Sequence, residues 1–348
     1  MLYIIFLTAK CNLKCKYCGG SIPSSVMSSE IKYSLKDLKD FISSDSEPSI
    51  AFYGGEPLLR IDLMKRMMDE IEAKRFIIQT NGLFLKRVEE EYIRRFSSVL
   101  VSIDGRRGVT DFYRGRGVYD AVIENVRRIK DIFRGELIAR MVAAEKTDIF
   151  RDVTHLLSLD LFTHVHWQLN AVWSPSELWS DFKSWVRRYN TGISKLVDFW
   201  VNEMRRGRVL GIVPFLGVVK ALLGYENTSP PCGAGVNAFA ITTDGRVLAC
   251  PVCADFDWNV LGDLKRGIIR SVEILEPCRS CEYSKICGGR CLFFNRERLW
   301  GSEGFELVCS TTKHLIREIE RVKDVAIKLC GREKLIYPKF NNTTEIIP

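Results

Sequence analysis

Residues 1–20, MLYIIFLTAKCNLKCKYCGG, place three cysteines directly behind an apolar run. The run at residues 2–7 is typical of a buried strand. Cys11, Cys15 and Cys18 follow it, with three and then two residues between them. Clustered thiolates are typical metal ligands, and three of them leave one position of a four-ligand site open. The stretch therefore predicts a metal centre at a strand end that can still bind a small molecule.

Length and composition limit the class of protein. A chain of 348 residues, 46% of them hydrophobic, can bury a large core and is expected to form two domains. No secretory signal precedes the twelve cysteines, which favours a cytoplasmic protein whose thiols are reduced. The longest apolar stretch, residues 209–225, is interrupted by Pro214 and Lys220, so it predicts a buried helix rather than a membrane span.

The formal net charge of +8 raises the question of a nucleic-acid partner. The basic residues are dispersed along amphipathic segments such as residues 127–134, which is typical of solvated helix faces. Iron–sulfur clusters bound by four thiolates would each carry a charge of roughly −2, which offsets much of the excess. We therefore expect neither a nucleic-acid partner nor a membrane partner.

Strand-like and helix-like segments alternate through the first half of the chain. Amphipathic stretches, such as residues 119–132, separate short β-rich runs. This alternation predicts an α/β fold with a parallel sheet, closed partly or wholly into a barrel over residues 1–200. In such folds the chemistry gathers at the carboxyl ends of the strands. The six predicted strands lie within residues 2–8, 49–54, 76–82, 99–105, 137–144 and 164–170.

The second half of the chain has a different character. After a helical linker at residues 201–230, residues 231–310 contain eight of the twelve cysteines and few periodic segments. A domain so rich in loops is expected to need metal for its stability. From Thr311 the apolar spacing predicts a helix that ends near Gly331, within a last segment of residues 311–348.

Two motifs resemble the radical S-adenosylmethionine (SAM) superfamily: the cysteine triplet after the first strand, and Gly54-Gly55-Glu56-Pro57 after the second. The resemblance implies a partial (β/α)6 barrel and a [4Fe–4S] cluster held by Cys11, Cys15 and Cys18. It further implies that SAM binds the open iron and that one-electron reduction cleaves it to a 5′-deoxyadenosyl radical. Gly19-Gly20, where many relatives have an aromatic residue, departs from the family pattern.

The resemblance also implies roles for residues at the strand ends. Gly54 and Gly55 would let backbone approach the methionine moiety of SAM, and Glu56 would accept hydrogen bonds from its ammonium group. Ordinary structural hydrogen bonding is an alternative for the residues assigned from the later strands. By this resemblance the further SAM-binding candidates are Tyr17 near the adenine, Asn81 and Ser102 near the ribose, and Arg140 at the carboxylate.

The cysteines of residues 232–309 resemble the SPASM domain, a C-terminal extension of radical SAM enzymes that holds auxiliary iron–sulfur clusters. The resemblance implies two auxiliary [4Fe–4S] clusters, and thus three clusters in all. The second would be held by Cys278, Cys281, Cys287 and Cys309. The first would be held by Cys232, Cys250 and Cys291, with Cys253 as the nearest candidate for its fourth ligand.

Zinc is the alternative metal for these cysteines. The pairs Cys250–Cys253 and Cys278–Cys281 have the spacing of a zinc ribbon. A non-enzymatic zinc or iron–sulfur protein would, however, leave the Gly54–Glu56 motif unexplained. The remaining cysteines would also require a second site.

Other polar residues are weaker candidates. Alternation puts His164, His166, Gln168 and Asn170 on one face of a strand, where they contact SAM or substrate if that strand lines the barrel. Asp104, Asp111 and Arg114 resemble a family stretch that we interpret first as loop architecture and second as substrate contact. Asp255 is a candidate catalytic base.

The resemblance implies a peptide or protein side chain as the substrate, and a reductase such as flavodoxin or ferredoxin as the electron donor. A sulfatase-maturation role is disfavoured, because Pro251 stands where those relatives place an aspartate. The alternative is a radical SAM enzyme acting on a tetrapyrrole or another small-molecule cofactor precursor.

Overall fold

The computed structural model describes residues 1–170, 178–225, 229–298, 300–338 and 347–348. Within these residues the strands form one sheet in the order β11-β10-β9-β8-β1-β2-β3-β4-β5-β6-β7. The strands are β1 Leu2–Phe6, β2 Ser49–Tyr53, β3 Arg75–Thr80, β4 Phe96–Ser102, β5 Glu136–Ala143, β6 His164–Leu169, β7 Gly211–Ile212, β8 Ala238–Ile241, β9 Arg246–Leu248, β10 Val260–Asp263 and β11 Gly267–Ile268.

The central strands confirm the predicted α/β fold. All six strands expected from the sequence form, and β1 to β7 pair in chain order with every pair parallel. On the other side of β1, β8 pairs parallel to it, and β9, β10 and β11 continue the sheet antiparallel. Strands β7 and β11 lie at the two edges, so the described sheet is an open, partial barrel.

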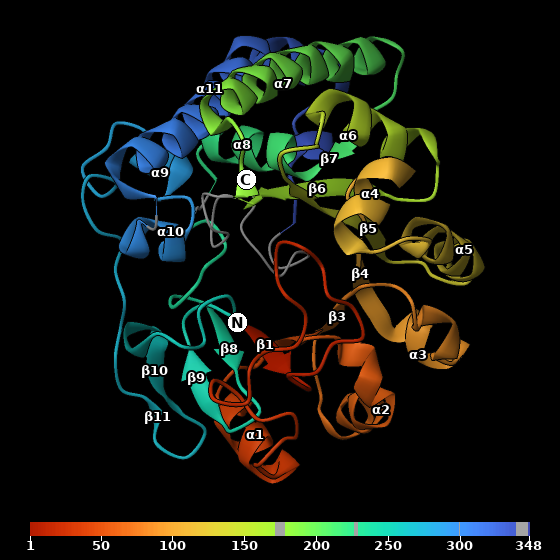
Figure 1. Cartoon of the computed structure of the whole chain (residues 1–348), viewed down its shortest axis with the longest axis vertical. Coiled ribbons are helices and arrows are strands. Elements are labelled where there is room, and N and C mark those ends of the chain that lie inside the picture. Colours follow the sequence, from red (N-terminus) through yellow and green to blue (C-terminus); the bar gives the residue numbers. More distant parts are fainter. Residues whose placement is uncertain (171–177, 226–228, 299, 339–346) are drawn as a thin grey trace.

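Helices follow the strands and cover the outside of the sheet (Figure 1). Helix α1 begins at a capping box, in which Ser34 and Asp37 bond to each other's backbone. The long helices α7 and α11 pack along each other. The helices are α1 Leu35–Ile42, α2 Ile61–Glu70, α3 Glu90–Arg95, α4 Arg107–Arg114, α5 Val118–Lys130, α6 Ile149–Ser158, α7 Phe182–Arg205, α8 Val213–Leu222, α9 Ser284–Cys287, α10 Leu292–Glu297 and α11 Gly301–Cys330.

Alternation along the strands divides the core into two layers. Ile5, Val101 and Trp167 belong to the large outer cluster beneath the helices. Ile4, Leu100 and Ile138 form a smaller cluster on the opposite face of the sheet, inside the barrel. Because successive strand residues point to opposite faces, the register decides which polar side chains enter the barrel.

The C-terminal part contains strands that were not expected from the sequence and a helix that begins earlier than predicted. Strands β8 to β11 extend the first sheet. Helix α11 begins at Gly301, ten residues before the predicted start, and so carries Cys309. Gly304 lowers helix propensity, but an added Cβ there would be 2.3 Å from the Trp300 Cβ, so the close packing at this position requires glycine.

The predicted end of α11 at Gly331 and the buried helix in residues 209–225, now α8, are confirmed. Among the described residues, no helix combines the length and the apolar character that a membrane crossing requires.

Candidate radical site and auxiliary cysteine groups

The cysteine triplet lies on the loop that follows β1. Cys15 is buried, Cys11 is half-buried and Cys18 is exposed. The Cys15 thiol hydrogen-bonds with Cys18, which lowers the pKa of Cys18 to about 6 and raises that of Cys15. Burial raises the pKa of Cys11, and the nearby Cys18 adds to this effect. The three thiols thus lie close enough to act on one another, as ligands of one cluster must.

The Gly54-Gly55 turn packs against the backbone that leads into the cysteine loop. Gly55 N–H donates to the Thr8 carbonyl at 3.0 Å, and Glu56 N–H donates to the Lys10 carbonyl at 2.8 Å. A Cβ on Gly54, whose φ is +145°, would lie 2.4 Å from the Thr8 oxygen, and one on Gly55 would lie 2.3 Å from the Lys10 oxygen. Glycine is therefore required here because the backbone of residues 8–10 passes close by. This requirement is separate from the expected approach of SAM.

We expect Gly55→Ala to disturb the cysteine loop directly. The new Cβ meets fixed backbone rather than a movable side chain, and overpacking of this kind costs about 1–3 kcal/mol. Thermal unfolding should show a lower midpoint, and the iron bound by the triplet should be lost more readily. Gly108→Ala is the matched control, because nothing lies within 4 Å of an added Cβ there. Equal behaviour of the two variants would contradict this interpretation.

Glu56 joins the ends of β2 and β3. Its carboxylate is 1% exposed and accepts hydrogen bonds from Leu58 N–H at 3.0 Å, the Thr80 hydroxyl at 2.6 Å and Asn81 N–H at 2.7 Å. Burial raises the pKa of Glu56 to about 7, although these three donors oppose the shift. Because its pKa is raised by burial, this carboxylate would be stabilised in its ionised form by a cationic partner. Thr80, which the sequence interpretation missed, is part of this site.

Asn81 connects the same strand end to the cysteine loop. Its Nδ2 donates to Asn12 Oδ1 at 2.8 Å, and its side chain hydrogen-bonds with the Cys11 thiol, which lowers the pKa of that thiol. Its Oδ1 accepts from Leu83 N–H at 3.1 Å. The candidate SAM residue Asn81 therefore lies beside Cys11, one of the three candidate cluster ligands, as its position after β3 predicts.

Asp104 and Arg114 form a buried pair behind the cysteine loop. Arg114 Nε and Nη2 donate to the two carboxylate oxygens of Asp104, each at 2.8 Å. The same carboxylate accepts from the Tyr17 hydroxyl at 2.8 Å and from Val142 N–H at 2.9 Å. Tyr17, the candidate adenine neighbour, is thus anchored through its hydroxyl. The interpretation of Asp104 and Arg114 as loop architecture agrees with these contacts.

Asp111 belongs to the same stretch but makes local contacts. Its carboxylate accepts from Gly117 N–H and Tyr119 N–H, both at 2.9 Å. It therefore fixes the turn between α4 and α5, which supports the architectural interpretation for this residue too.

The strand register brings three candidates into one row. Ser102 on β4 pairs with Arg140 on β5, which pairs with His166 on β6. Leu100 and Ile138, two residues earlier on β4 and β5, belong to the inner core cluster, so this row faces the barrel interior. Arg140 and His166 are buried and Ser102 is half-buried. Polar side chains thus line the barrel beside the strand ends.

The four polar residues expected on one face here lie at two levels. Gln168 follows His166 toward the carboxyl end of β6, and Asn170 lies directly after the strand. His164 lies at the opposite end, where its ring meets Tyr337 edge to face and burial lowers its pKa to about 4. His164 is therefore remote from the cysteine loop along the strand, and its packing is structural.

A group of four thiols lies in the C-terminal region. The pKa of Cys287 is raised to about 12, first by burial and then by the neighbouring Cys278, Cys309 and Cys281. Burial also raises the pKa of Cys278 and of Cys309. Cys309 and Cys281 add to the shift at Cys278, and Cys281 adds to the shift at Cys309. A loop and the helices α9 and α11 therefore bring together the four residues that the family resemblance assigns to the second auxiliary cluster: Cys278, Cys281, Cys287 and Cys309.

The segments that carry the other four cysteines also pack together. The Asn259 side chain accepts from Cys250 N–H and donates to the carbonyls of Cys250 and Cys253, each at 2.8 Å. An added Cβ on Gly235, close to Cys232, would lie 3.2 Å from the Ala249 Cβ. Phe293, close to Cys291, packs on Phe256 with ring centroids 5.4 Å apart. Nothing in the spacing of the cysteines indicates the role of Asn259.

A second buried asparagine fixes the loop before Cys278. Asn295 accepts from Leu275 N–H at 2.7 Å and donates to the Leu275 carbonyl at 3.0 Å. Its side chain also hydrogen-bonds with the Cys278 thiol and lowers the pKa of that thiol. As with Asn259, the sequence pattern carries no signal for this residue, because its partners are backbone groups twenty residues away.

The described residues contain no group of three or more His, Cys, Asp or Glu side chains arranged for a single metal ion. A four-iron cluster is larger than one ion, so its thiolate ligands stand farther apart. The all-thiol donor sets fit such clusters. Asp255 is exposed on the loop after Cys253, and its catalytic role stays a prediction.

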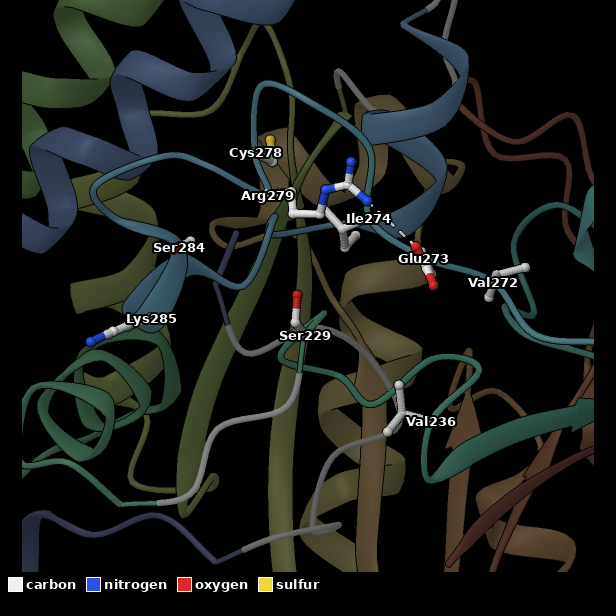
Figure 2. A pocket seen from close by; sticks show the side chains of 9 residues that line it. All are labelled: Ser229, Val236, Val272, Glu273, Ile274, Cys278, Arg279, Ser284 and Lys285. Carbon is white, nitrogen blue, oxygen red and sulfur yellow. Dashed lines mark ion pairs between the residues drawn. The ribbon is translucent and has the colours of Figure 1, made fainter.

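A pocket of about 650 Å³ adjoins the four-thiol group (Figure 2). Ser229 and Val236 line one side, and residues between Val272 and Lys285, including Cys278, line the rest. Arg279 and Glu273, which both belong to this second part of the lining, form an ion pair at 3.6 Å. The pocket thus lies between the segment that carries Cys232 and the loop that carries Cys278.

Comparisons with known sequences agree with this geometry. A family model described as the Radical SAM superfamily matches residues 5–148. The AdoMet-dependent heme synthase of Methanosarcina barkeri is 32% identical over 335 residues, which cover 81% of this chain and 88% of that protein. The cysteine-type anaerobic sulfatase-maturating enzyme of Clostridium perfringens is 21% identical over 335 residues, covering 81% of this chain and 85% of that protein.

Solved structures show the same fold. Native anSMEcpe with bound AdoMet (SAM) has a TM-score of 0.73 at 20% identity, covering 94% of this chain and 100% of that chain. The same protein with bound AdoMet and Cp18Cys peptide has a TM-score of 0.70 at 19% identity, covering 94% and 99%. Three observations lead to the same family: the cysteine triplet, the Gly-Gly-Glu turn and the 32% identity to the heme synthase. The chain belongs to the radical SAM superfamily and is an enzyme with a SPASM-type C-terminal region.

Proposed function

We propose that this enzyme uses the 5′-deoxyadenosyl radical to modify a side chain of a peptide or protein. The observation that carries the proposal is the likeness, over 94% of this chain, to a structure solved with both AdoMet and a peptide bound. The modification would be a crosslink, an oxidation or a related maturation step.

The residues at the strand ends would hold the cosubstrate. Cys11, Cys15 and Cys18 would bind the SAM-binding cluster, which supplies the electron and the open iron that cleave SAM. Glu56, buried and with a raised pKa, would receive the ammonium group of SAM, whose charge favours the ionised carboxylate. Arg140 would face the SAM carboxylate, with Ser102 beside it in the register. Asn81 and Tyr17 would complete the pocket around the nucleoside.

The C-terminal region would hold two auxiliary [4Fe–4S] clusters. The second uses Cys278, Cys281, Cys287 and Cys309, which act on one another electrostatically. The first uses Cys232, Cys250 and Cys291, with Cys253 as fourth ligand, since Asn259 fixes the Cys250 and Cys253 backbone together. A cluster there can accept the electron that the substrate radical releases. A flavodoxin or ferredoxin would supply the reducing electron at the N-terminal cluster.

The second candidate substrate class is a tetrapyrrole. The relative that is 32% identical over 88% of its length is named a heme synthase, which favours this class independently of the fold. The two classes differ in what must reach the barrel: a side chain on an extended backbone, or a large planar macrocycle.

Substrate-dependent cleavage of SAM separates the two classes. Reconstituted enzyme, dithionite and SAM would be incubated without oxygen, either with peptides encoded beside this gene or with a panel of iron porphyrins. We expect a peptide to raise 5′-deoxyadenosine formation and to change in mass, while porphyrins do neither. The Cys15→Ala variant supplies the background rate. The proposal would be contradicted if a porphyrin raised 5′-deoxyadenosine formation and was itself converted, while none of the peptides had either effect.

A further inference from the structure

The surface beside the cysteine triplet is basic. Residues 1–29 contain three lysines and neither aspartate nor glutamate. All three lie on the triplet loop, where one precedes Cys11 and the other two flank Cys15. A fourth lysine lies on the segment after β5. We call these four exposed residues the lysine group: Lys10, Lys14, Lys16 and Lys146.

Tyr113 of α4 fixes the backbone of two of these lysines. Its carbonyl accepts from Lys16 N–H at 2.9 Å, and its hydroxyl accepts from Lys146 N–H at 3.0 Å. Tyr113 itself is 7% exposed and packs with Cys15 and Tyr17 in a small apolar core. The triplet loop and the segment after β5 are thus joined above one of the candidate cluster ligands.

An exposed phenylalanine belongs to the same surface. Phe112 precedes Tyr113 on α4, and 39% of it is exposed. Lys16 Nζ lies 3.4 Å from the centroid of its ring, and Lys146 Nζ lies 4.6 Å from the same centroid. A cation within about 6 Å of an aromatic ring is attracted to its face. The ring therefore holds two positive charges beside an exposed apolar surface.

Neighbouring carboxylates do not neutralise the lysine group. None of its four members forms an ion pair with any residue that the structure describes, whereas Lys65 pairs with Glu89 at 2.8 Å. Glu145 precedes Lys146, but it is half-buried and accepts from Ser180 N–H at 2.9 Å. The surface thus presents positive charge to solvent.

An acidic protein is the complement of such a surface. Oppositely charged patches steer two proteins together and speed their encounter. Aromatic side chains are enriched in protein interfaces, and the interfaces of electron-transfer complexes are small. An electron must enter the enzyme close to the cluster that receives it. The position beside Cys15 therefore favours an electron donor among the acidic proteins.

We propose that the lysine group and Phe112 form the docking surface for a flavodoxin, an acidic protein whose flavin lies close to its surface. The inference rests on the proposed function, which places a cluster at the triplet and names the class of donor. In the docked complex the reduced flavin would lose one electron and the oxidised cluster would gain it, and no bond would form or break. The lysines and Phe112 position the donor and take no part in the cleavage of SAM.

The first test measures binding. Reconstituted enzyme is titrated with oxidised flavodoxin in a calorimeter without oxygen, at ionic strengths of about 0.01 M and 0.15 M, where charges are screened over about 30 Å and 8 Å. The double variant Lys16→Glu/Lys146→Glu reverses two charges, and Phe112→Ala removes the ring alone. Lys195→Glu is the matched control, because Lys195 is an exposed lysine of α7 without an ion pair to any described residue.

We expect the double variant to raise the Kd for flavodoxin at least about tenfold at the lower ionic strength, because two attractive charges become repulsive. The difference from wild type should shrink at the higher ionic strength, since salt screens exposed charges. Phe112→Ala should weaken binding to a similar extent at both ionic strengths. Lys195→Glu should bind as wild type does.

A second readout separates docking from the chemistry. Formation of 5′-deoxyadenosine is measured against flavodoxin concentration and, in parallel, with dithionite, which needs no docking surface. The double variant should need at least about tenfold more flavodoxin for its half-maximal rate. Its dithionite-driven rate and its iron content should equal those of wild type.

Unchanged flavodoxin binding in the double variant would overturn the proposal, as would wild-type enzyme that does not bind flavodoxin. Equal loss of the flavodoxin-driven and dithionite-driven rates, or loss of iron, would also overturn it, because the lysines would then serve the cluster or its loop. Wild-type enzyme that cleaves no SAM even with dithionite would contradict the proposed function instead. The dithionite series therefore distinguishes the two failures.

Discussion

Cys15→Ala should abolish reductive cleavage of SAM while the auxiliary clusters remain. Cys15 is the buried member of the triplet and shares a hydrogen bond with Cys18, so its loss removes one ligand and changes another. Loss of a side chain that only supports a metal ligand already lowers metal affinity or activity by about 10–100-fold. We therefore expect 5′-deoxyadenosine formation to fall by more than about 100-fold, and bound iron by about four atoms per chain.

Cys330→Ala is the matched control for this substitution. The Cys330 thiol lies at the end of α11, donates to the Ala326 carbonyl at 3.0 Å and belongs to none of the three cysteine groups. Iron content and nucleoside formation should stay at the parent level. Wild-type cleavage of SAM by Cys15→Ala would contradict the assignment of the triplet.

Asp104→Ala should cause the largest loss of stability among single substitutions near the site. The Asp104 carboxylate receives two hydrogen bonds from Arg114, one from Tyr17 and one from the Val142 backbone. Removal of one partner of a buried ion pair costs about 3–5 kcal/mol, because the other charge stays buried. Calorimetry should show a lower unfolding midpoint, and the freed Tyr17 should weaken retention of the N-terminal cluster.

Glu90→Ala is the control for the ion pair. Its partner Arg94 is one helical turn away and both side chains are well exposed, so the pair contributes about 0.3–0.5 kcal/mol. If Asp104→Ala unfolded at the same temperature as Glu90→Ala, the buried network would not hold the loop as described.

The sequence was sufficient for the features that are local or repeated along the chain. Strands β1 to β6 are apolar runs bounded by polar turns, so their order and parallel pairing follow from the alternation with helices. The cysteine triplet and the turn at Gly54 were placed correctly at neighbouring strand ends, because such ends meet at one edge of a parallel sheet.

Features that depend on distant contacts could not be predicted in this way. Strand β8 pairs with β1 across more than 200 residues, and neither segment carries a sign of its partner. The start of α11 was misjudged because Gly301 and Gly304 disfavour helix, whereas Trp300 at its start packs on the distant Phe182 of α7. Thr80, Asn259 and Asn295 were missed because they act through backbone and carboxylate groups that only the fold brings near.

Electron paramagnetic resonance of the dithionite-reduced enzyme, recorded before and after addition of SAM, tests whether the triplet leaves one iron open. We expect SAM to change the signal of the N-terminal cluster, and 5′-deoxyadenosine to form in the same sample. The Cys15→Ala variant should show neither effect. An unchanged signal with no nucleoside, from protein that carries its full iron, would contradict an open iron at Cys11, Cys15 and Cys18.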